Sequence, residues 1–160
     1  MNRRRQKPKM DAKRWATSVD PLEMVCYLED AGCYLEFEAF FMDCFNRIRH
    51  ELVHPDVLAT PFTFGVDVDE LTDAAQAAID DMNRHLTELD EDSKEWKKLD
   101  REIRYSKTVL ARDYHDFGEA NRFLSAYLIE ISDDALSESR IQADFLRSNY
   151  DFPFVPRGEE

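Results

Sequence analysis

Apolar residues with helical spacing between positions 35 and 53 constrain the fold of this chain more than any other feature. Seven of them share one face of such a helix: Phe37, Phe40, Phe41, Cys44, Phe45, Ile48 and Leu52. A face that is so broad and so apolar must be buried against other elements. We therefore expect a helix over residues 35–53 at the centre of the core. It should end before Pro55, because a residue that precedes proline avoids the helical region.

The rest of the chain continues this helical pattern and shows no alternation typical of strands. We predict further helices over residues 21–31, 68–89, 94–117, 119–131 and 134–150, and a loop over residues 55–66. The content of only 4 glycines and 6 prolines suits a helix-rich protein. The expected fold is all-α: a single compact bundle of five to six helices with a basic N-terminal arm and an extended C-terminal tail.

Charge is unevenly distributed along the chain. Residues 1–14 carry seven basic residues and one acid, a net charge of +6, whereas the whole chain carries −13, which leaves −19 for residues 15–160. We expect residues 1–14 to form a flexible basic arm, residues 15–154 to form the helical bundle domain, and residues 155–160 to form a tail. A body this acidic repels nucleic acid over most of its surface.

The three cysteines, Cys26, Cys33 and Cys44, lie in apolar stretches and form no C-x-x-C pair. This arrangement argues against a zinc knuckle or a redox dithiol and indicates buried free thiols in a reducing compartment. No apolar run approaches the length of about 20 residues that a membrane span needs. The basic start is not followed by the apolar segment of a secretory signal. We therefore expect a cytoplasmic protein that does not enter a membrane and needs no cofactor.

Residues 49–55, RHELVHP, contain two overlapping catalytic signatures. His50, Glu51 and His54 form the H-E-x-x-H pattern of zinc proteases, in which two histidines one helical turn apart hold the metal. Because His54 precedes Pro55, we expect it to leave the helix and to lose this geometry. No candidate for a third protein ligand stands out. A zinc hydrolase that uses His50 and His54 is therefore the remote alternative.

Arg49 and His54 form the second signature, R-x4-H. The stretch IRHELVHPD resembles the HEPN family of helical-bundle ribonucleases, whose motif lies at the end of a helix. The resemblance implies that Arg49 steadies the scissile phosphate, that His54 transfers protons, and that His50 occupies the polar position after the arginine. It also implies RNA as the substrate, no metal, and a homodimer that pairs the two motifs. The acidic body and the lack of another basic cluster beside the motif count against this ribonuclease.

The same residues also have a purely structural interpretation. Basic side chains at the C-terminal end of a helix interact favourably with the helix dipole, and Arg49 and His54 lie at such an end. Acids are enriched at the start of the next long helix, so Arg49 or His54 is expected to pair with one of them across the loop. The candidate partners are Asp67, Asp69 and Glu70.

Two segments near the ends of the chain carry a further pattern. The first has a W-x4-D-P-x2-M opening and a helix after it: Trp15, Asp20, Pro21, Met24, Leu28, Phe40, Cys44, Arg47, Ile48, His50 and Leu52. The second is QADFLRSNYDFPF, residues 142–154, in which a Leu-Arg pair precedes an aromatic residue and Pro-Phe. Together these segments resemble a helical module of uncharacterised planctomycete proteins. The resemblance implies a helical fold and no assigned activity.

These observations favour a non-enzymatic helical adaptor that binds a protein partner, with no catalytic residue assigned. Its expected contact residues lie in the basic arm and in the aromatic loop: Arg3, Arg4, Arg5, Phe62 and Phe64. The alternative is a metal-independent ribonuclease of the HEPN type that uses Arg49, His50 and His54. In the ribonuclease, Arg49 and His54 converge in an open groove or across a two-fold interface. In the adaptor, they pair with carboxylates of the next helix.

Overall fold

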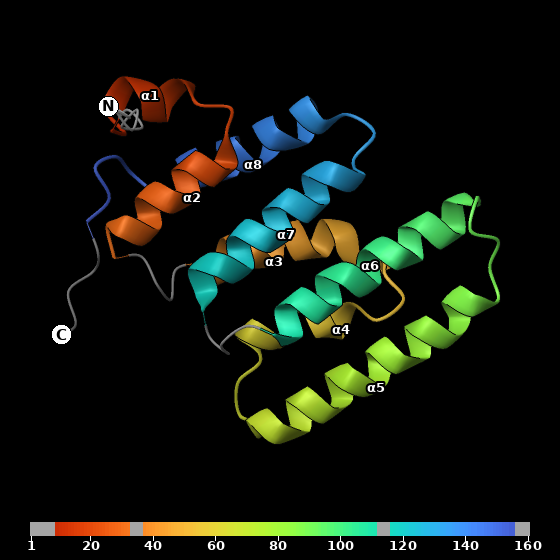
Figure 1. Ribbon diagram of the computed structural model, residues 1–160. Helices are drawn as coiled ribbons and strands as arrows, with labels where there is room; N and C mark the ends of the chain where they lie inside the picture. The colour runs from red at the N-terminus through yellow and green to blue at the C-terminus, as the bar shows by residue number, and fades with distance from the viewer. Residues whose placement is uncertain (1–8, 33–36, 112–115, 156–160) are drawn as a thin grey trace, which may run out of the picture.

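The computed structural model describes residues 9–32, 37–111 and 116–155 (Figure 1). Within these residues it contains eight α-helices, no strand, and two short 3-10 helices, η1 (Arg49–Glu51) and η2 (Thr60–Phe62). The predicted all-α class is confirmed, whereas the predicted number of five to six helices is too low. The helices that the apolar spacing misses are α1 (Ala12–Thr17) and α4 (Pro55–Leu58). Each is shorter than two turns, so no repeating pattern marks it in the sequence.

Most of the longer helices begin at a residue that caps them. The longer helices are α2 (Pro21–Asp30), α3 (Phe37–Ile48), α5 (Val68–Thr87), α6 (Lys94–Leu110), α7 (Phe117–Ile131) and α8 (Ala135–Asn149). At four starts, a side-chain oxygen accepts a hydrogen bond from a first-turn backbone N–H: the capping residues are Asp20, Ser93, Asp116 and Asp134. They satisfy donors that have no partner within the helix. Across the described ranges, none of the helices combines the length and the apolar composition that a membrane span requires.

The main core surrounds α3, as the spacing of its apolar residues predicts. Its buried face consists of Phe37, Phe40, Phe41, Cys44, Phe45 and Ile48. α3 packs against α7 and α8, and α2 packs against the same two helices, so that one large cluster of buried side chains joins all four. α3 is shorter than predicted, because it ends at Ile48 and continues as η1.

A second, smaller core lies between α5 and α6. Its buried residues are Ile79 and Met82 of α5 and Leu99 and Ile103 of α6. α5 packs mainly against α6, with further contacts to α4. In Figure 1 it lies at the edge of the molecule remote from α1 and α2. Within the described residues, the buried apolar side chains therefore form two clusters in the fold that the sequence predicts as a single compact bundle.

The segment after Pro55, which the sequence predicts as a loop, is partly helical. Pro55 opens α4 at a position where the missing N–H of proline has no intrahelical acceptor to lose, and η2 follows. The ring of Phe62 packs on Phe41 and Phe117, with centroid distances of 4.4 Å and 4.8 Å. Phe64 is 56% exposed. Of the two aromatic residues predicted as contacts, Phe62 is thus a packing residue and Phe64 is the accessible one.

The two ends of the described chain are held together. Trp15 of α1 packs on Tyr27 and Phe152, with ring centroids 5.6 Å and 6.4 Å away. The guanidinium group of Arg147 donates hydrogen bonds to the backbone carbonyls of Trp15 at 3.1 Å and Ser18 at 2.6 Å. The N-terminal helices and the C-terminal segment of the described chain therefore contact each other.

The N-terminal arm expected over residues 1–14 is only partly described. Its last three residues belong to α1, and Arg14 forms an ion pair with Glu23 of α2. The arm residues expected to contact a partner lie outside the described residues: Arg3, Arg4 and Arg5.

The cysteines differ in their surroundings. Cys44 is buried, and this burial raises the pKa of its thiol. Cys26 is exposed, so the expectation of a buried thiol is confirmed for Cys44 and wrong for Cys26. Cys33 lies outside the described residues.

Candidate functional site

The RHELVHP segment, residues 49–55, changes conformation twice. Its first three residues form η1, after which the backbone becomes extended at Leu52. His54 has φ −129° and ψ 71°, outside the helical region. The predicted departure of His54 from the helix is confirmed. The segment therefore lacks the continuous helix on which the zinc-protease pattern places its two histidines.

A buried glutamate of α6 anchors the end of this segment. Glu102 is 2% exposed, and its two carboxylate oxygens accept hydrogen bonds from the backbone N–H groups of Val53 at 2.8 Å and His54 at 2.9 Å. Hydrogen bonds to a charged acceptor are among the stronger ones in proteins. Sequence reasoning missed Glu102, although its position beside Ile103 and three residues after Leu99 puts it on the buried stripe of α6.

The side chain of His54 pairs with α5. Its Nε2 atom lies 2.7 Å from Oδ2 of Asp81, and Arg84 and His85 approach the same carboxylate at 3.0 Å and 3.6 Å. The hydrogen bond with His54 holds the pKa of Asp81 below its ordinary value. The sequence predicts that Arg49 or His54 pairs with an acid near the start of α5. For His54 this prediction is wrong, because its side chain meets α5 well beyond the first turn. Those acids are Asp67, Asp69 and Glu70.

Arg49 and His50 have other neighbours. The guanidinium group of Arg49 is exposed and lies over the ring of Phe45, 5.7 Å from its centroid. The Nε2 atom of His50 lies 3.9 Å from a carboxylate oxygen of Glu51, whose other oxygen accepts a hydrogen bond from Nζ of Lys98 at 2.5 Å. This hydrogen bond from Lys98 lowers the pKa of Glu51.

The two histidines of the segment line separate grooves. His50 lines a groove of about 980 Å³ beside α6, whereas His54 lines a groove of about 520 Å³ between α4 and α5. In the part of the chain that the structure describes, no group of three or more His, Cys, Asp or Glu side chains is arranged to hold a metal ion. This geometry gives Arg49, His50 and His54 different surroundings and brings them to no common centre.

The larger groove, here called the α6 groove, is unusually basic for this chain. Six basic side chains line it, from the end of α3, η1 and the first half of α6: Arg47, His50, Lys94, Lys97, Lys98 and Arg101. Aliphatic side chains also line it, from the RHELVHP segment and α7: Leu52, Leu128 and Ile131. The inference that no other basic cluster lies beside the motif is therefore wrong. α6 brings basic residues that are distant in sequence next to η1.

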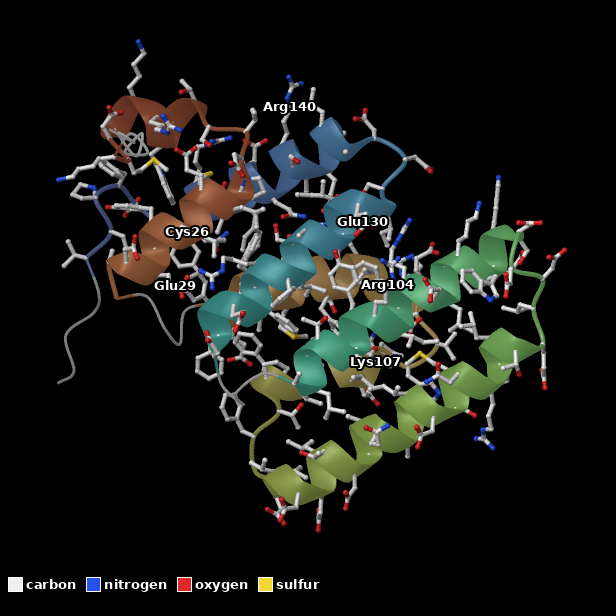
Figure 2. All side chains as sticks on the ribbon, in the orientation of Figure 1. Cys26, Glu29, Arg104, Lys107, Glu130 and Arg140 are labelled. Atoms are coloured by element: carbon white, nitrogen blue, oxygen red, sulfur yellow. The ribbon has the colours of Figure 1, made fainter. Side chains whose placement is uncertain are left out.

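The basic side of the groove follows from the spacing of residues on α6. Four basic residues occur at positions i, i+3, i+4 and i+7 and so share one face: Lys94, Lys97, Lys98 and Arg101. Figure 2 shows Arg104 and Lys107 further along the same helix, outside the groove lining. This basic spacing is visible in the sequence, although the apolar residues of the helix do not indicate it.

Three of the six basic side chains already pair with carboxylates of the chain: Arg47 with Asp43 and Glu138, Lys98 with Glu51, and Arg101 with Glu130. Lys94 and Lys97 are exposed and have no carboxylate partner among the described residues. His50 is also exposed, with Glu51 at the limit of ion-pair distance. Lys94 and Lys97 can therefore bind an anion without the loss of an ion pair seen among the described residues.

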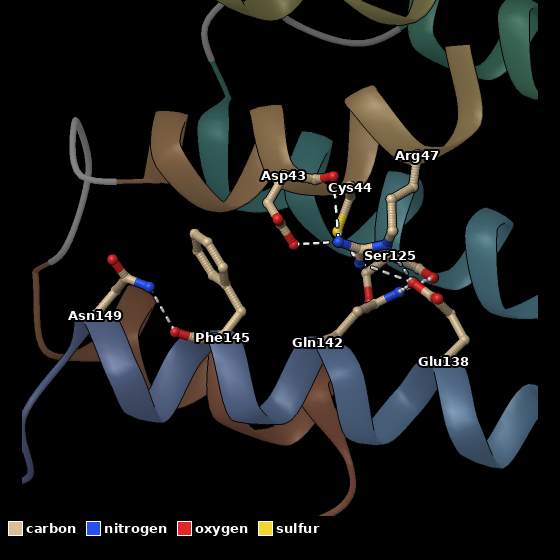
Figure 3. Close-up of polar contacts among 8 residues, drawn as sticks. All are labelled: Asp43, Cys44, Arg47, Ser125, Glu138, Gln142, Phe145 and Asn149. Carbon is tan, nitrogen blue, oxygen red and sulfur yellow. Dashed lines mark hydrogen bonds and ion pairs between the residues drawn. The ribbon is translucent and has the colours of Figure 1, made fainter. Parts of the chain in front are cut away.

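A buried polar network holds Arg47 in place (Figure 3). Its Nη2 atom donates to Oε1 of Glu138 at 2.8 Å, and the amide nitrogen of Gln142 donates to the same oxygen at 3.1 Å. The hydroxyl group of Ser125 donates to the side-chain oxygen of Gln142. Glu138, Gln142 and Ser125 are all buried. The network links α3, α7 and α8 and fixes this edge of the α6 groove.

The tyrosine of the groove lining is buried. Tyr127 is 2% exposed, and its ring stacks on that of Tyr105 with centroids 4.1 Å apart. The hydroxyl group of Tyr105 donates to Glu130 at 2.8 Å. Burial, with the added effect of this carboxylate, raises the pKa of Tyr105 to about 12. The ring of Tyr127 is therefore occupied by contacts within the protein.

Comparisons of the chain with protein-family models, with curated proteins and with solved structures found no match. The function is therefore inferred from the α6 groove and the RHELVHP segment. Both depend on α6, which contributes Glu102 to the segment and four basic side chains to the groove.

Proposed function

We propose that this protein is a non-enzymatic interaction domain that binds an anionic segment of a protein partner in the α6 groove. The observation that carries the proposal is the convergence of six basic side chains on one groove of a chain whose net charge is −13. Lys94 and Lys97 are exposed there without a carboxylate partner among the described residues. A basic patch of this kind attracts a complementary anionic segment and orients it.

The acidic remainder of the surface adds to selectivity. It repels an anionic segment that approaches from most directions, so that association is steered towards the α6 groove. Such an interaction is expected to weaken as salt concentration rises, because exposed charges are screened over about 10 Å at 0.1 M salt.

The contacts of the RHELVHP segment support a structural role for it. A HEPN-type ribonuclease would use Arg49 and His54 on one phosphate, yet the first lies over an aromatic ring of α3 and the second is held by a carboxylate of α5. A zinc hydrolase would need both histidines on one continuous helix, and α3 ends before them. The segment instead supplies His50 to the α6 groove and is anchored to α6 by Glu102.

Binding of a fluorescent polyglutamate peptide to the full chain at low salt, followed by anisotropy, tests the proposal. Lys94→Glu combined with Lys97→Glu should weaken binding at least about tenfold, because two attractive charges become repulsive. Arg104→Glu combined with Lys107→Glu is the matched control. It makes the same change of charge on the same helix outside the groove lining, and should change affinity by no more than about twofold. Equal losses in the two double variants, or no binding by the wild type, would refute the site.

The ribonuclease alternative can be tested on the same protein. It requires cleavage of single-stranded RNA in the presence of EDTA, and loss of that cleavage in both Arg49→Ala and His54→Ala. We expect no such cleavage by the wild type. EDTA-resistant cleavage that both substitutions abolish would overturn the non-enzymatic proposal, and zinc-dependent peptide cleavage would overturn both interpretations.

A further inference from the structure

We infer that the segment bound in the α6 groove is an acidic peptide that carries an aliphatic anchor residue. The inference rests on the proposed function of the groove and specifies the chemistry of its partner. Two kinds of side chain in the lining support it: cations contributed mainly by α6, and aliphatic residues contributed mainly by α7.

The aliphatic part of the lining is suited to an apolar side chain. Leu128 and Ile131 lie three residues apart on α7, on one face of the helix, and Leu52 joins them from the RHELVHP segment. Leu128 is buried, whereas Leu52 and Ile131 are only partly buried and retain apolar surface that a ligand can cover. Removal of this surface and of a leucine anchor from water corresponds to a gain in affinity of about tenfold or more.

The cationic part of the lining is suited to carboxylates. Lys94 and Lys97 lie three residues apart on α6, which places their Cβ atoms roughly 5–6 Å apart. Neighbouring acidic side chains on one face of a peptide have a similar separation. The groove volume of about 980 Å³ is large enough for several residues of such a peptide. An acidic peptide with one aliphatic residue can therefore occupy both parts of the lining together.

A nucleic acid fits the same groove less well. Single-stranded nucleic acids gain much of their affinity from bases that stack on exposed aromatic rings. Among the described residues, Tyr127 is the one Phe, Tyr or Trp side chain of the lining, and its ring is buried against Tyr105, which leaves the imidazole of His50 as the exposed ring. Carboxylates of Glu51, Asp133 and Glu138 also line the groove, and they disfavour a phosphate backbone and an acidic peptide alike.

The test uses two fluorescent glutamate-rich peptides that differ at one central position, which is leucine in one and serine in the other. The wild-type chain should bind the leucine peptide at least about tenfold more tightly in anisotropy titrations. Ile131→Ser should remove most of this difference, because it should weaken the leucine peptide more than the serine peptide. Lys94→Glu combined with Lys97→Glu should weaken both peptides alike.

The outcomes separate this inference from the proposed function. Equal binding of the two peptides by the wild type would overturn the aliphatic anchor, while the groove would stand if the lysine double variant still weakened both. Tighter binding of an oligouridine than of the leucine peptide, lost in the lysine double variant, would overturn the assignment to a peptide. If the lysine double variant changed nothing, the proposed function itself would fail. Because Ile131 packs on the main core, thermal melting by circular dichroism checks that its variant folds. The comparison of peptides on the wild type does not depend on that variant.

Discussion

The two hydrophobic cores of this protein are held together by different means. The main core joins α2, α3, α7 and α8 through a large cluster that includes the rings of Phe40 and Phe41. The core between α5 and α6 has four buried apolar residues. Polar contacts also attach this smaller core to the RHELVHP segment. Glu102 of α6 accepts hydrogen bonds from the backbone of the segment, and Asp81 of α5 pairs with His54. The RHELVHP segment therefore lies between the two cores and connects them through these polar contacts.

The size of a core decides how independently it can open. Stabilisation by burial scales with the apolar area removed from water, so the small cluster of α5 and α6 contributes less than the main core. α5 also packs mainly on one neighbour. We therefore expect α5 to open locally at a lower free energy than the whole chain unfolds.

Phe41→Ala in the main core should have the largest effect. Its buried ring contacts Phe45 and Phe62, and removal should lower the free energy of unfolding by roughly 3–5 kcal/mol in urea denaturation. Met42→Ala is the control, an exposed position on the same helix, where the change should be about 1 kcal/mol or less. A loss below about 1 kcal/mol for Phe41→Ala would contradict the position of the main core.

Met82→Ala in the second core should have a smaller and more local effect. Met82 is fully buried between α5 and α6, and the cavity should lower the free energy of unfolding by about 2–3 kcal/mol. Hydrogen exchange followed by mass spectrometry should show faster exchange in α5 than in α3. If exchange rose equally in both helices, the two cores would open as one unit, which would contradict the local opening of α5.

Glu102→Gln tests the hydrogen bonds that anchor the RHELVHP segment to α6. The amide keeps one acceptor oxygen and turns an NH2 group towards the second backbone N–H, so one hydrogen bond is lost at a buried position. The expected cost is about 1–2 kcal/mol, with faster amide exchange at Val53 or His54 observed by NMR. Glu95→Gln is an exposed control on the same helix. Unchanged exchange at both amides would show that Glu102 does not anchor the segment.

His54→Ala should have the smallest effect, because the site is partly exposed. We expect a decrease in Tm of no more than about 2 °C at neutral pH. The hydrogen bond with His54 lowers the pKa of Asp81. Its contribution is therefore present above the ordinary carboxyl pKa and is lost as pH falls through the lowered value. The difference in Tm between wild type and variant should shrink on acidification, and a difference that grows would contradict the pairing. His85→Ala, at 3.6 Å from the same carboxylate, is the control and should change Tm less.

Long amphipathic helices made much of the fold predictable from sequence. α3 shows the repeating apolar spacing, and α5 and α6 begin at the predicted residues, Val68 and Lys94. α1 and α4 are too short to repeat any pattern. The predicted helix over residues 94–117 is too long, because α6 ends at Leu110 with Ala111 as its C-terminal cap, and residues 112–115 lie outside the described residues. Phe117, predicted as the end of that helix, instead begins α7, which Asp116 caps.

The candidate site was predictable only in part. The RHELVHP segment is conspicuous, and Pro55 correctly signals where His54 leaves the helix. Its partners on α6 are 47, 48 and 49 residues away in the chain, so only tertiary packing brings Lys98 and Glu102 to it. His54 pairs with Asp81 because of the way in which α5 packs beside the segment, and this packing cannot be seen in the sequence either. The basic face of α6, by contrast, could be found from its helical spacing.

The contact between the two ends of the chain has a consequence for how the protein is made. Arg147 reaches back across 129 and 132 residues to the carbonyls of Ser18 and Trp15. α3 is covered by α7 and α8, which the ribosome synthesises after it. The aromatic face of α3 therefore emerges well before the helices that bury it exist. This apolar face stays uncovered for much of the synthesis of the chain, and the main core closes only when α7 and α8 leave the ribosome.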